Sequence, residues 1–379
     1  MRRTTLALFP LLLSLAAGCH DAAIEHYNLG IDAMQRGDTT AAVTEFEASV
    51  AARPTDPDAH LNLGVALLGA GQPERALEQF QIAAQTGDPA DVTVHLNMAE
   101  AYRSMGRVQA AKTEYEYAIR RDPEMVEALA GYGQLLIDTG DYPEARDMLL
   151  KAISLRPSHA PAQFSLAWLY MRTDRYLDAT HYFIRGLREE PKSTYGRLGL
   201  AESYLARNMP DDAIAEFQKV YVADSTSVDA MVGIGECQVR RGNFVQAESI
   251  LRRAVEVAPD DARGHRCLGD AFVARGLNVE AVGHYRMAIQ LKDDYAEAYL
   301  GLGTALEAAG DLVQAESALQ TALLNAPRNP AVLYRLGLVY AQNHDPDRAR
   351  IYYEMALDVT GEDRTMRARI MSAIEDTRR

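Results

Sequence analysis

Small and large hydrophobic residues recur along this chain with a period of 34 residues. Alanine marks the period in ten successive windows, at Ala42, Ala76, Ala111, Ala145, Ala179, Ala213, Ala247, Ala281, Ala315 and Ala349. Every step is 34 residues except the one between the second and third alanines, which is 35. A constant period of this length predicts an array of helical hairpins, each stacked on the next.

Two further positions keep the same register, and each has a packing reason. Twelve residues before each alanine the residue is small: Gly30, Gly64, Ala99, Gly133, Ala167, Ala201, Gly235, Gly269, Gly303 and Gly337. Four residues after it the residue is large and apolar: Phe46, Phe80, Tyr115, Leu149, Phe183, Phe217, Leu251, Tyr285, Leu319 and Tyr353. A small residue lets two helix backbones approach closely, and the large residue fills the space between them. The spacings keep these residues on one apolar stripe, so each window is expected to hold two amphipathic helices.

Residues that end helices stand at fixed places in the same windows. Glycine lies five residues before the alanine in seven windows, for example at Gly37 and Gly310, where it can adopt the left-handed conformation that ends a helix. Proline lies twelve residues after the alanine in six windows, as at Pro54 and Pro327, and cannot continue a helix because it lacks an N–H. The middle turn and the end of each hairpin are therefore predicted as well.

This set of positions resembles the tetratricopeptide repeat (TPR) family. In the ninth window the signature positions hold Tyr299, Leu302-Gly303, Leu306, Ala315, Leu319, Ala322 and Pro327. The resemblance covers residues 23–363. It implies an all-α fold, a right-handed superhelical solenoid of ten helical hairpins plus a C-terminal capping helix, and a protein that binds other proteins in a concave groove without a cofactor.

The register also sets the expected boundaries. Residues 1–18 are expected to be a lipoprotein-type signal peptide and residues 19–22 a short tether. The repeats are expected at residues 23–56, 57–90, 92–125, 126–159, 160–193, 194–227, 228–261, 262–295, 296–329 and 330–363, with the capping helix at 364–379. The apolar stripe of that last helix is Met366, Ile370, Ala373 and Ile374, which suits a helix that covers the open face of the tenth repeat.

The amino terminus has the pattern of a secretory signal. Arg2 and Arg3 precede an apolar run at residues 6–17, which is too short to span a bilayer as a stable helix. Residues 15–19, Leu-Ala-Ala-Gly-Cys, resemble the bacterial lipobox, in which the signal is cut before a cysteine that is then acylated. We therefore expect a lipid anchor on Cys19, and His20 in place of aspartate implies, by the same resemblance, the outer membrane facing the periplasm. Simple secretion or a cytosolic location is the alternative.

The charge of the chain narrows the possible partners. It contains 39 Lys and Arg against 53 Asp and Glu, a formal net charge of −14. Nucleic acids and anionic lipid surfaces attract clustered positive charge, so neither is expected to bind here by electrostatics. Gly131-Tyr132-Gly133 has the look of a phosphate loop, but the register places it inside a helix, so no nucleotide site is expected.

Histidine recurs four residues before the small position, where TPR sequences often have tryptophan. The four histidines are His26, His60, His95 and His265. A row of histidines suggests a metal site, but these residues recur at least one full repeat apart, and packing requires a flat ring there. We therefore expect a packing role and no bound metal.

A row of asparagines is one candidate for partner binding. Asn28, Asn62 and Asn97 recur in the first three repeats, two residues before the small position. Each amide offers a donor and an acceptor, so the row could bind the backbone of an extended peptide. The alternative is that asparagine is simply frequent at this position in the family.

An aromatic patch is the second candidate. The single tryptophan, Trp168, does not occupy the family's tryptophan position. It is expected to form an apolar anchor in the groove together with Phe164, Met171, Tyr195 and Leu198. The alternative is that Trp168 packs between neighbouring first helices.

In the later repeats, charged residues occupy positions of the first helices that are expected to face the groove. The residues are Asp229, Glu236, Asp270, Glu297 and Glu307, with Arg240, Arg263 and Arg266. We expect this mixture to be a solvated face rather than a site. Cys237 and Cys267 lie on the first helices of adjacent repeats, either as buried small residues or as a disulfide.

These features favour a non-catalytic scaffold. The sequence shows no nucleophile beside a base, no paired carboxylates and no metal-ligand cluster. We expect a lipid-anchored TPR protein of the bacterial envelope that holds a peptide or helix in its groove during assembly of pilus, secretion, polysaccharide-export or cell-wall machinery. A soluble secreted or cytosolic adaptor is the alternative, and an enzyme is a more distant one.

Overall fold

Helices follow one another throughout the computed structural model, which describes residues 9–361 and 363–377, with side chains from residue 22 onward. All regular elements in these ranges are α-helices, so the all-α class is confirmed. The chain divides into two units, Met1–Pro191 and Lys192–Arg379. Among the described residues, no helix has both the length and the apolar character needed to cross a membrane. Residues 1–8 of the expected signal peptide lie outside the described part of the chain.

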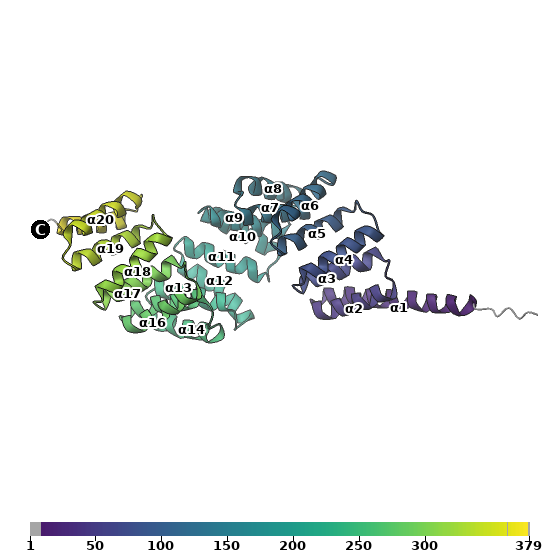
Figure 1. The fold of residues 1–379 in the computed structure, drawn as a ribbon, viewed down its shortest axis with the longest axis horizontal. Helices are drawn as coiled ribbons and strands as arrows, with labels where there is room; N and C mark the ends of the chain where they lie inside the picture. The colour runs from purple at the N-terminus through teal and green to yellow at the C-terminus, as the bar shows by residue number, and fades with distance from the viewer. Residues whose placement is uncertain (1–8, 362, 378–379) are drawn as a thin grey trace, which may run out of the picture. The chain divides into compact units, whose positions relative to one another are not determined.

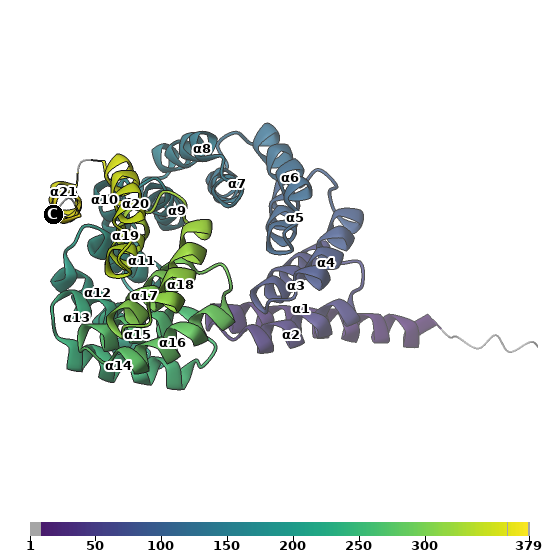
Figure 2. The same cartoon turned by 60° about the vertical axis from the view of Figure 1, so that its left-hand side comes forward.

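Both units are built from helical hairpins (Figure 1). The first unit consists of α1 (Phe9–Gln35), α2 (Thr39–Ala52), α3 (Pro57–Gly69), α4 (Pro73–Thr86), α5 (Val92–Ser104), α6 (Val108–Arg121), α7 (Val126–Thr139), α8 (Tyr142–Leu155), α9 (Ala160–Arg172) and α10 (Tyr176–Glu189). The second unit consists of α11 (Thr194–Ala206), α12 (Pro210–Ala223), α13 (Val228–Arg240), α14 (Phe244–Val257), α15 (Ala262–Ala274), α16 (Asn278–Leu291), α17 (Ala296–Ala308), α18 (Leu312–Asn325), α19 (Pro330–Gln342), α20 (Pro346–Val359) and α21 (Arg364–Asp376). Figure 2 shows α5 beside α6 and α7 beside α8, and the paired helices pack against each other.

Before several first helices, among them α3, α5, α9 and α15, a capping side chain accepts from free N–H groups of the first turn. The carboxylate of Asp56 accepts from the N–H groups of Asp58 and Ala59 at the start of α3. Proline suits the following position because its fixed φ matches a helix and it has no N–H to leave unpaired, and α3 begins at Pro57. These caps fix where the first helix of a hairpin begins.

The middle turn of each hairpin needs one residue in the left-handed conformation. Gly140 ends α7 with φ of +86°. Three hairpins lack glycine at this place, and there Asp174, Asn208 and His344 adopt φ of 57°, 58° and 59°. Aspartate, asparagine and histidine tolerate this region better than other side chains do, so the turn is kept without glycine.

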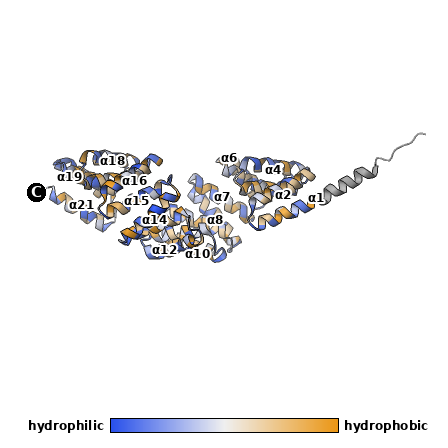
Figure 3. Ribbon diagram, turned by 90° about the horizontal axis from the view of Figure 1, so that it is seen from below, coloured by the Kyte–Doolittle hydropathy of each residue, from blue (hydrophilic) through white to orange (hydrophobic). Residues whose placement is uncertain are grey.

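The core of each unit contains the expected contacts, in which a large residue of a second helix packs against a small residue of a first helix. Ala315 and Leu319 on α18 are fully buried, and a Cβ atom added to Gly303 on α17 would lie 2.5 Å from Leu319 Cγ. In the second unit one continuous cluster runs from Met231 on α13 to Ile370 on α21. Figure 3 shows hydrophobic and hydrophilic residues alternating along single helices such as α14 and α16, as amphipathic helices require.

The last helix covers the end of the array as expected. Ile370 is fully buried, and Met366, Ala373 and Ile374 are partly buried against the same cluster. Helix α21 packs against α20, so the tenth hairpin does not end on an open apolar face. The capping helix is therefore present in the structure.

Two glycines of the second unit allow the packing to be tested. Gly303→Ala should lower the free energy of unfolding by about 1–3 kcal/mol, because the new methyl group meets Leu319 in a filled core. Gly283, exposed within α16, has nothing within 4 Å of an added Cβ, so Gly283→Ala should raise stability by up to about 1 kcal/mol. Urea unfolding followed by circular dichroism measures both changes, and a shift of the same sign in the two variants would contradict the packing role of Gly303.

Candidate partner-binding surface

The first helices of successive hairpins pack side by side within each unit. In the first unit α3 contacts α5, α5 contacts α7, and α7 contacts α9. In the second unit the same relation joins α11, α13, α15, α17 and α19. We call the surface formed by these first helices the first-helix wall of each unit. A wall of parallel helices presents one row of side chains after another, which is how repeat arrays bind extended partners.

The asparagine row lies on the first helices of the first unit, and two of its three side chains already donate hydrogen bonds within the protein. Asn62 Nδ2 donates to Tyr27 Oη and to the carbonyl oxygen of Asp58, both at 2.9 Å. Asn97 Nδ2 donates to the carbonyl oxygen of Thr93 at 2.8 Å, and Asn28 is exposed. Asn62 therefore connects two hairpins through Tyr27, and both hydrogens of its amide are used within the protein.

Phe164 does not line the wall, and the expectation that it would is wrong. Its side chain is only 3% exposed, and its ring lies 6.4 Å from that of Phe183 on α10. Gly186 on α10 provides the space, because a Cβ there would collide with the Phe164 ring. Phe164 is therefore a core residue of its own hairpin.

The other members of the predicted aromatic patch fall in both units. Trp168 on α9 is half-buried and meets Phe183 edge-on, with ring centroids 5.4 Å apart, and Met171 is also half-buried. Tyr195 and Leu198 lie on α11 of the second unit, where Tyr195 is 52% exposed and Leu198 packs partly against the core. Trp168 thus has a packing role within its hairpin, and its role as an anchor stays a prediction.

A polar cluster that the sequence did not reveal lies on the wall of the first unit. Tyr115 Oη donates to Glu100 Oε1 at 2.5 Å, and Arg103 Nη2 donates to Glu100 Oε2 at 2.8 Å. Arg103 Nη1 also lies 3.6 Å from Asp138 Oδ2 on α7. A cavity of about 290 Å³ adjoins these groups and is lined by Glu100, Arg103, Glu127, Ala130, Gly131, Gln134, His159, Pro161 and Ser165. We call Glu100, Arg103, Tyr115 and Asp138 the Glu100 cluster.

The tyrosine of this cluster belongs to a second helix, α6, and its hydroxyl reaches the wall of first helices. Tyr115 is the large residue of α6 and is fully buried. Gly131 on α7 leaves room for it, because a Cβ there would lie 2.7 Å from Tyr115 Cε1 and 2.6 Å from Glu100 Oε1. A larger residue at position 131 would therefore displace the hydroxyl from its carboxylate.

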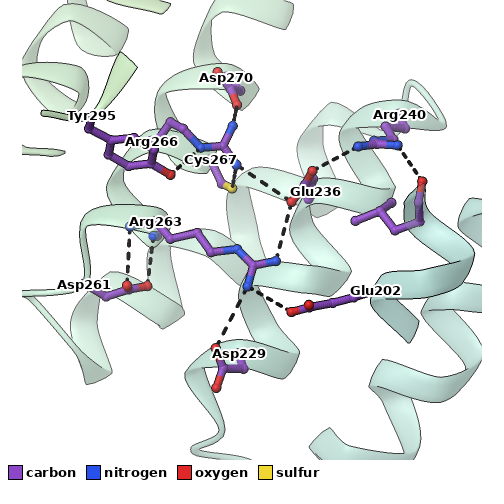
Figure 4. A network of polar contacts seen from close by, with 12 residues as sticks. Glu202, Asp229, Glu236, Arg240, Asp261, Arg263, Arg266, Cys267, Asp270 and Tyr295 are labelled. Atoms are coloured by element: carbon purple, nitrogen blue, oxygen red, sulfur yellow. Dashed lines mark hydrogen bonds and ion pairs between the residues drawn. The ribbon is translucent and has the colours of Figure 1, made fainter. Parts of the chain in front are cut away.

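A larger polar network occupies the wall of the second unit (Figure 4). Its members are Glu202 on α11, Asp229, Glu236 and Arg240 on α13, Arg263, Arg266 and Asp270 on α15, and Tyr295 before α17. We call these residues the Arg263–Arg266 network. A cavity of about 280 Å³ beside it is lined by Glu236, Val239, Arg240, Arg266, Cys267 and Asp270.

The two central arginines join the helices of this network. Arg263 Nη1 lies 3.4 Å from Glu202 Oε1, and Arg263 Nη2 lies 3.7 Å from Glu236 Oε2. Arg266 Nη2 lies 3.7 Å from the same Glu236 oxygen, and Arg266 Nε donates to Tyr295 Oη at 2.9 Å. The network therefore ties α11, α13, α15 and the start of α17 into one surface.

Most of these charges are shielded from water. The side chain of Arg266 is 16% exposed and that of Glu236 is 21% exposed. Burial raises the pKa of the Asp270 carboxyl and that of Glu202, and the neighbouring arginines oppose the shift. The expectation of a solvated face is therefore wrong for Arg266 and Glu236, whereas Asp229, with 69% of its side chain exposed, is solvated as expected.

Two other acidic groove positions differ from each other. Glu307 is 8% exposed at its side chain and pairs with Arg335 at 3.0 Å, so it too is shielded rather than solvated. Glu297 is exposed, as expected. The wall of the second unit thus has a braced centre and solvated positions around it.

The same arrangement of tyrosine, acid and glycine recurs in the two units. Tyr285 Oη donates to Asp270 Oδ1 at 2.6 Å, as Tyr115 does to Glu100. Gly301 on α17 leaves room for Tyr285. An acidic residue directly after the small position, combined with tyrosine as the large residue, is the sequence signal that would have found both sites.

The two cysteines of the second unit are unpaired thiols. Cys237 and Cys267 are both free and buried. Burial raises the pKa of each thiol to about 12, so neither forms the reactive thiolate near neutral pH. Among the described residues no group of three or more His, Cys, Asp or Glu could hold a metal ion.

Removing Arg266 tests how far the network stabilises the wall. Arg266→Gln should lower the free energy of unfolding by about 2–4 kcal/mol at pH 7.5, because it leaves Asp270 shielded without its cation. Burial already makes the folded protein hold the Asp270 proton more tightly than the unfolded chain does, so the loss should be smaller at pH 4.5. Arg348→Gln is the control, because Arg348 is 63% exposed in its pair with Asp345 and should contribute under about 1 kcal/mol. Similar losses in the two variants would contradict this role of Arg266.

Family models match most of the chain in the register of the hairpins. A model described as "Tetratricopeptide repeat" matches residues 27–91, 96–160, 164–228 and 300–364. A second model with the same description matches residues 204–269, and one described as "TPR repeat" matches residues 269–310.

The sequence identity to individual proteins is low. Human DnaJ homolog subfamily C member 3 is 26% identical over 217 residues, which are 57% of this chain and 39% of that protein. The type IV pilus assembly protein PilF of Pseudomonas aeruginosa is 27% identical over 133 residues, which are 35% of this chain and 52% of that protein. The crystal structure of yeast Tom70 has a TM-score of 0.51 and 13% identity over 94% of this chain and 96% of that one, a likeness of fold alone.

The chain therefore matches well under two thirds of the length of these curated relatives. The family models, by contrast, cover more than half of the chain, and each match falls on hairpins that the structure describes. The expected solenoid of ten hairpins and a cap is present, and the surface available to partners is formed by its first helices. The chain belongs to the tetratricopeptide repeat family, whose repeats mediate protein–protein interaction.

Proposed function

We propose that this protein is a non-catalytic scaffold that binds a peptide or helix of a partner protein along its first-helix walls. The observation that carries the proposal is the pairing, in each unit, of a half-buried polar cluster with a cavity of about 280–290 Å³. A concave site with a few fixed polar groups can hold one side chain in a defined orientation. Neither cluster offers a nucleophile beside a base, so the walls suit recognition rather than chemistry.

The charge of the clusters favours a basic partner segment. The Arg263–Arg266 network contains four carboxylates, of Glu202, Asp229, Glu236 and Asp270, and three arginines. The Glu100 cluster contains two carboxylates and one arginine. Carboxylates are in excess in both, as they are in the whole chain at −14, so a lysine or arginine of a partner complements each wall. The same charge disfavours nucleic acid and nucleotides.

The amino-terminal sequence supports a place in the bacterial envelope. Arg2, Arg3 and the apolar run before Cys19 have the order of a lipoprotein signal, and a lipid on Cys19 would hold the array at a membrane. The similarity to PilF, a protein named for type IV pilus assembly, is consistent with such a location. We place the protein at the outer membrane facing the periplasm, as a scaffold for pilus, secretion, polysaccharide-export or cell-wall machinery.

The lipid anchor is tested by its acceptor residue. Wild-type protein expressed in a Gram-negative host should incorporate radiolabelled palmitate and fractionate with membranes, and Cys19→Ser should lose both properties because it removes the acylated thiol. Cys237→Ser is the matched control and should keep both, since that thiol is buried. Soluble, unlabelled wild-type protein would support the secreted or cytosolic adaptor instead.

The basic partner is tested with peptides of known charge. A fluorescent peptide that carries spaced lysines and arginines should bind the protein at low salt, and its charge-reversed counterpart should not. Asp229 is 69% exposed on the wall, so Asp229→Lys should weaken binding about threefold to tenfold through like-charge repulsion. Asp211→Lys makes the same change of charge at a residue that is 77% exposed on a second helix, α12, and should change binding much less. Equal affinity for the two peptides would overturn the proposal.

A further inference from the structure

The histidine positions make one recurring contact between the two helices of a hairpin. Nε2 of His60, His95 and His265 lies 3.0–3.1 Å from a proline carbonyl oxygen six residues earlier. Nδ1 of each faces the residue nineteen positions later, on the second helix, at 2.5–3.1 Å. His26 makes the second of these contacts, with Glu45, at 2.7 Å. The histidines are therefore hydrogen-bonding residues as well as packing residues.

The residue that faces histidine Nδ1 from the second helix carries an amide or carboxylate oxygen in three of these four repeats and an imidazole in the other. It is Glu45 in the first repeat, Gln79 in the second and Glu114 in the third. In the eighth repeat it is His284 on α16, whose Nδ1 lies 3.1 Å from Nδ1 of His265 on α15. A ring that itself binds protons thus stands where the other repeats have an amide or carboxylate oxygen.

The contact with the proline fixes how protons are shared in the eighth repeat. The carbonyl oxygen of Pro259 can only accept, so Nε2 of His265 carries a hydrogen. Nδ1 of neutral His265 is then an acceptor, and His284 Nδ1 donates to it. The Nδ1–Nδ1 hydrogen bond needs an acceptor nitrogen and so requires that at least one of the two rings be neutral, whereas in the third repeat the carboxylate of Glu114 can accept from His95 whichever form the ring has.

Beyond burial and His265, the charged side chain that shifts the pKa of His284 is positive, namely that of Arg252. The rings of His265 and His284 stack 5.4 Å apart, and His284 also stacks on Phe272 at 5.4 Å. Arg252 on α14 lies over Phe272, with its Cζ 5.1 Å from the ring centroid. Glu248, the carboxylate nearest to that arginine, is bound by Arg252 and by Arg275 at the end of α15.

The remaining neighbours of α15 direct their polar groups elsewhere. Glu236 of α13 and Tyr295 before α17 contact Arg266 rather than the histidines. The carboxylate of Asp261 accepts from the N–H groups of Arg263 and Gly264 at the start of α15. These carboxylates therefore bind arginines or backbone N–H groups rather than the histidines, and Glu280, one turn before His284 on α16, is exposed to solvent.

We propose that the His265–His284 pair is a pH-sensitive latch that holds α15 and α16 together while at least one ring is neutral and loosens this hairpin when both rings are positively charged. When both rings have gained a proton, the hydrogen bond is lost for want of an acceptor, and two like charges face each other with Nδ1 atoms 3.1 Å apart. Helix α15 also carries Arg263, Arg266 and Asp270, so loosening it disturbs the Arg263–Arg266 network. An effect of the latch on partner binding rests on the proposed function of that wall. The pH-dependent opening of the hairpin does not depend on it.

The direction of the pH effect follows from where the proton is bound more tightly. Burial lowers the pKa of His284, and His265 and Arg252 lower it further, so the folded protein binds this proton less readily than the unfolded chain does. As the pH falls through about 6.5, the ordinary pKa of histidine, His284 becomes protonated in the unfolded chain before it does in the folded protein. The hairpin is therefore most stable at neutral pH and loses stability as the pH falls.

Hydrogen–deuterium exchange of the full chain at pH 7.5 and 5.5, corrected for intrinsic exchange rates, tests the latch. Segments of α15 and α16 should open more at pH 5.5, about tenfold for each pKa unit that separates the folded and unfolded states. Segments of α5 and α6, which carry the His95–Glu114 pair, serve as the internal reference and should show no such increase.

Two variants copy the contacts of other repeats into the eighth one. His284→Gln reproduces the pair of the second repeat and should remove the pH effect, and His284→Glu reproduces that of the third and should remove or reverse it. Circular dichroism at pH 7.5 shows whether each variant folds, and His284→Gln alone suffices if the other does not. An equal pH response in both wild-type hairpins, or a response that persists in His284→Gln, would overturn the latch. Exchange needs no partner, so a failure of peptide binding would count against the proposed function only.

Discussion

The whole structure depends on one contact, a large apolar side chain of the second helix pressed against a small residue of the first. Full burial of such a side chain contributes about 1.5–3 kcal/mol, and the contact recurs in the seven hairpins whose small residue is glycine. Phe80 against Gly64 and Leu319 against Gly303 are two instances, one in each unit. A hairpin buries only part of its apolar surface by this contact, so it must stack on neighbours. Stacking places the first helices side by side, and a wall exists as a result.

The walls are then rigidified by polar groups rather than by further apolar packing. Arg263 and Arg266 connect helices of three hairpins through half-buried ion pairs, and Asn62 connects two hairpins through Tyr27. Half-buried ion pairs contribute little net stability, because desolvation offsets most of their attraction. Their effect is to fix side chains in one orientation, which a binding surface requires more than a core does.

Much of this fold could be predicted from the sequence because its packing rule is local and periodic. The site was harder, because burial at a given position depends on a residue in another helix. Phe164 is the example: its distance from the small position suggested the groove, but Gly186, where other repeats have alanine, opens space for it in the hairpin. The charges of the second wall were misjudged for a similar reason, since only the stacking of α13 on α15 brings Glu236 within reach of Arg266.

The buried tyrosines have a consequence for how such arrays diverge. Tyr115 and Tyr285 are at most 1% exposed, yet each determines how a carboxylate on the wall is held. Phe217 occupies the equivalent place in the sixth repeat and packs against Gly233 in the same way, but it has no hydroxyl to offer. Exchange of a buried tyrosine for phenylalanine removes one oxygen atom and can thus alter what the exposed surface recognises. Two arrays with identical surface residues can therefore select different partners, and specificity can evolve at positions that no ligand ever touches.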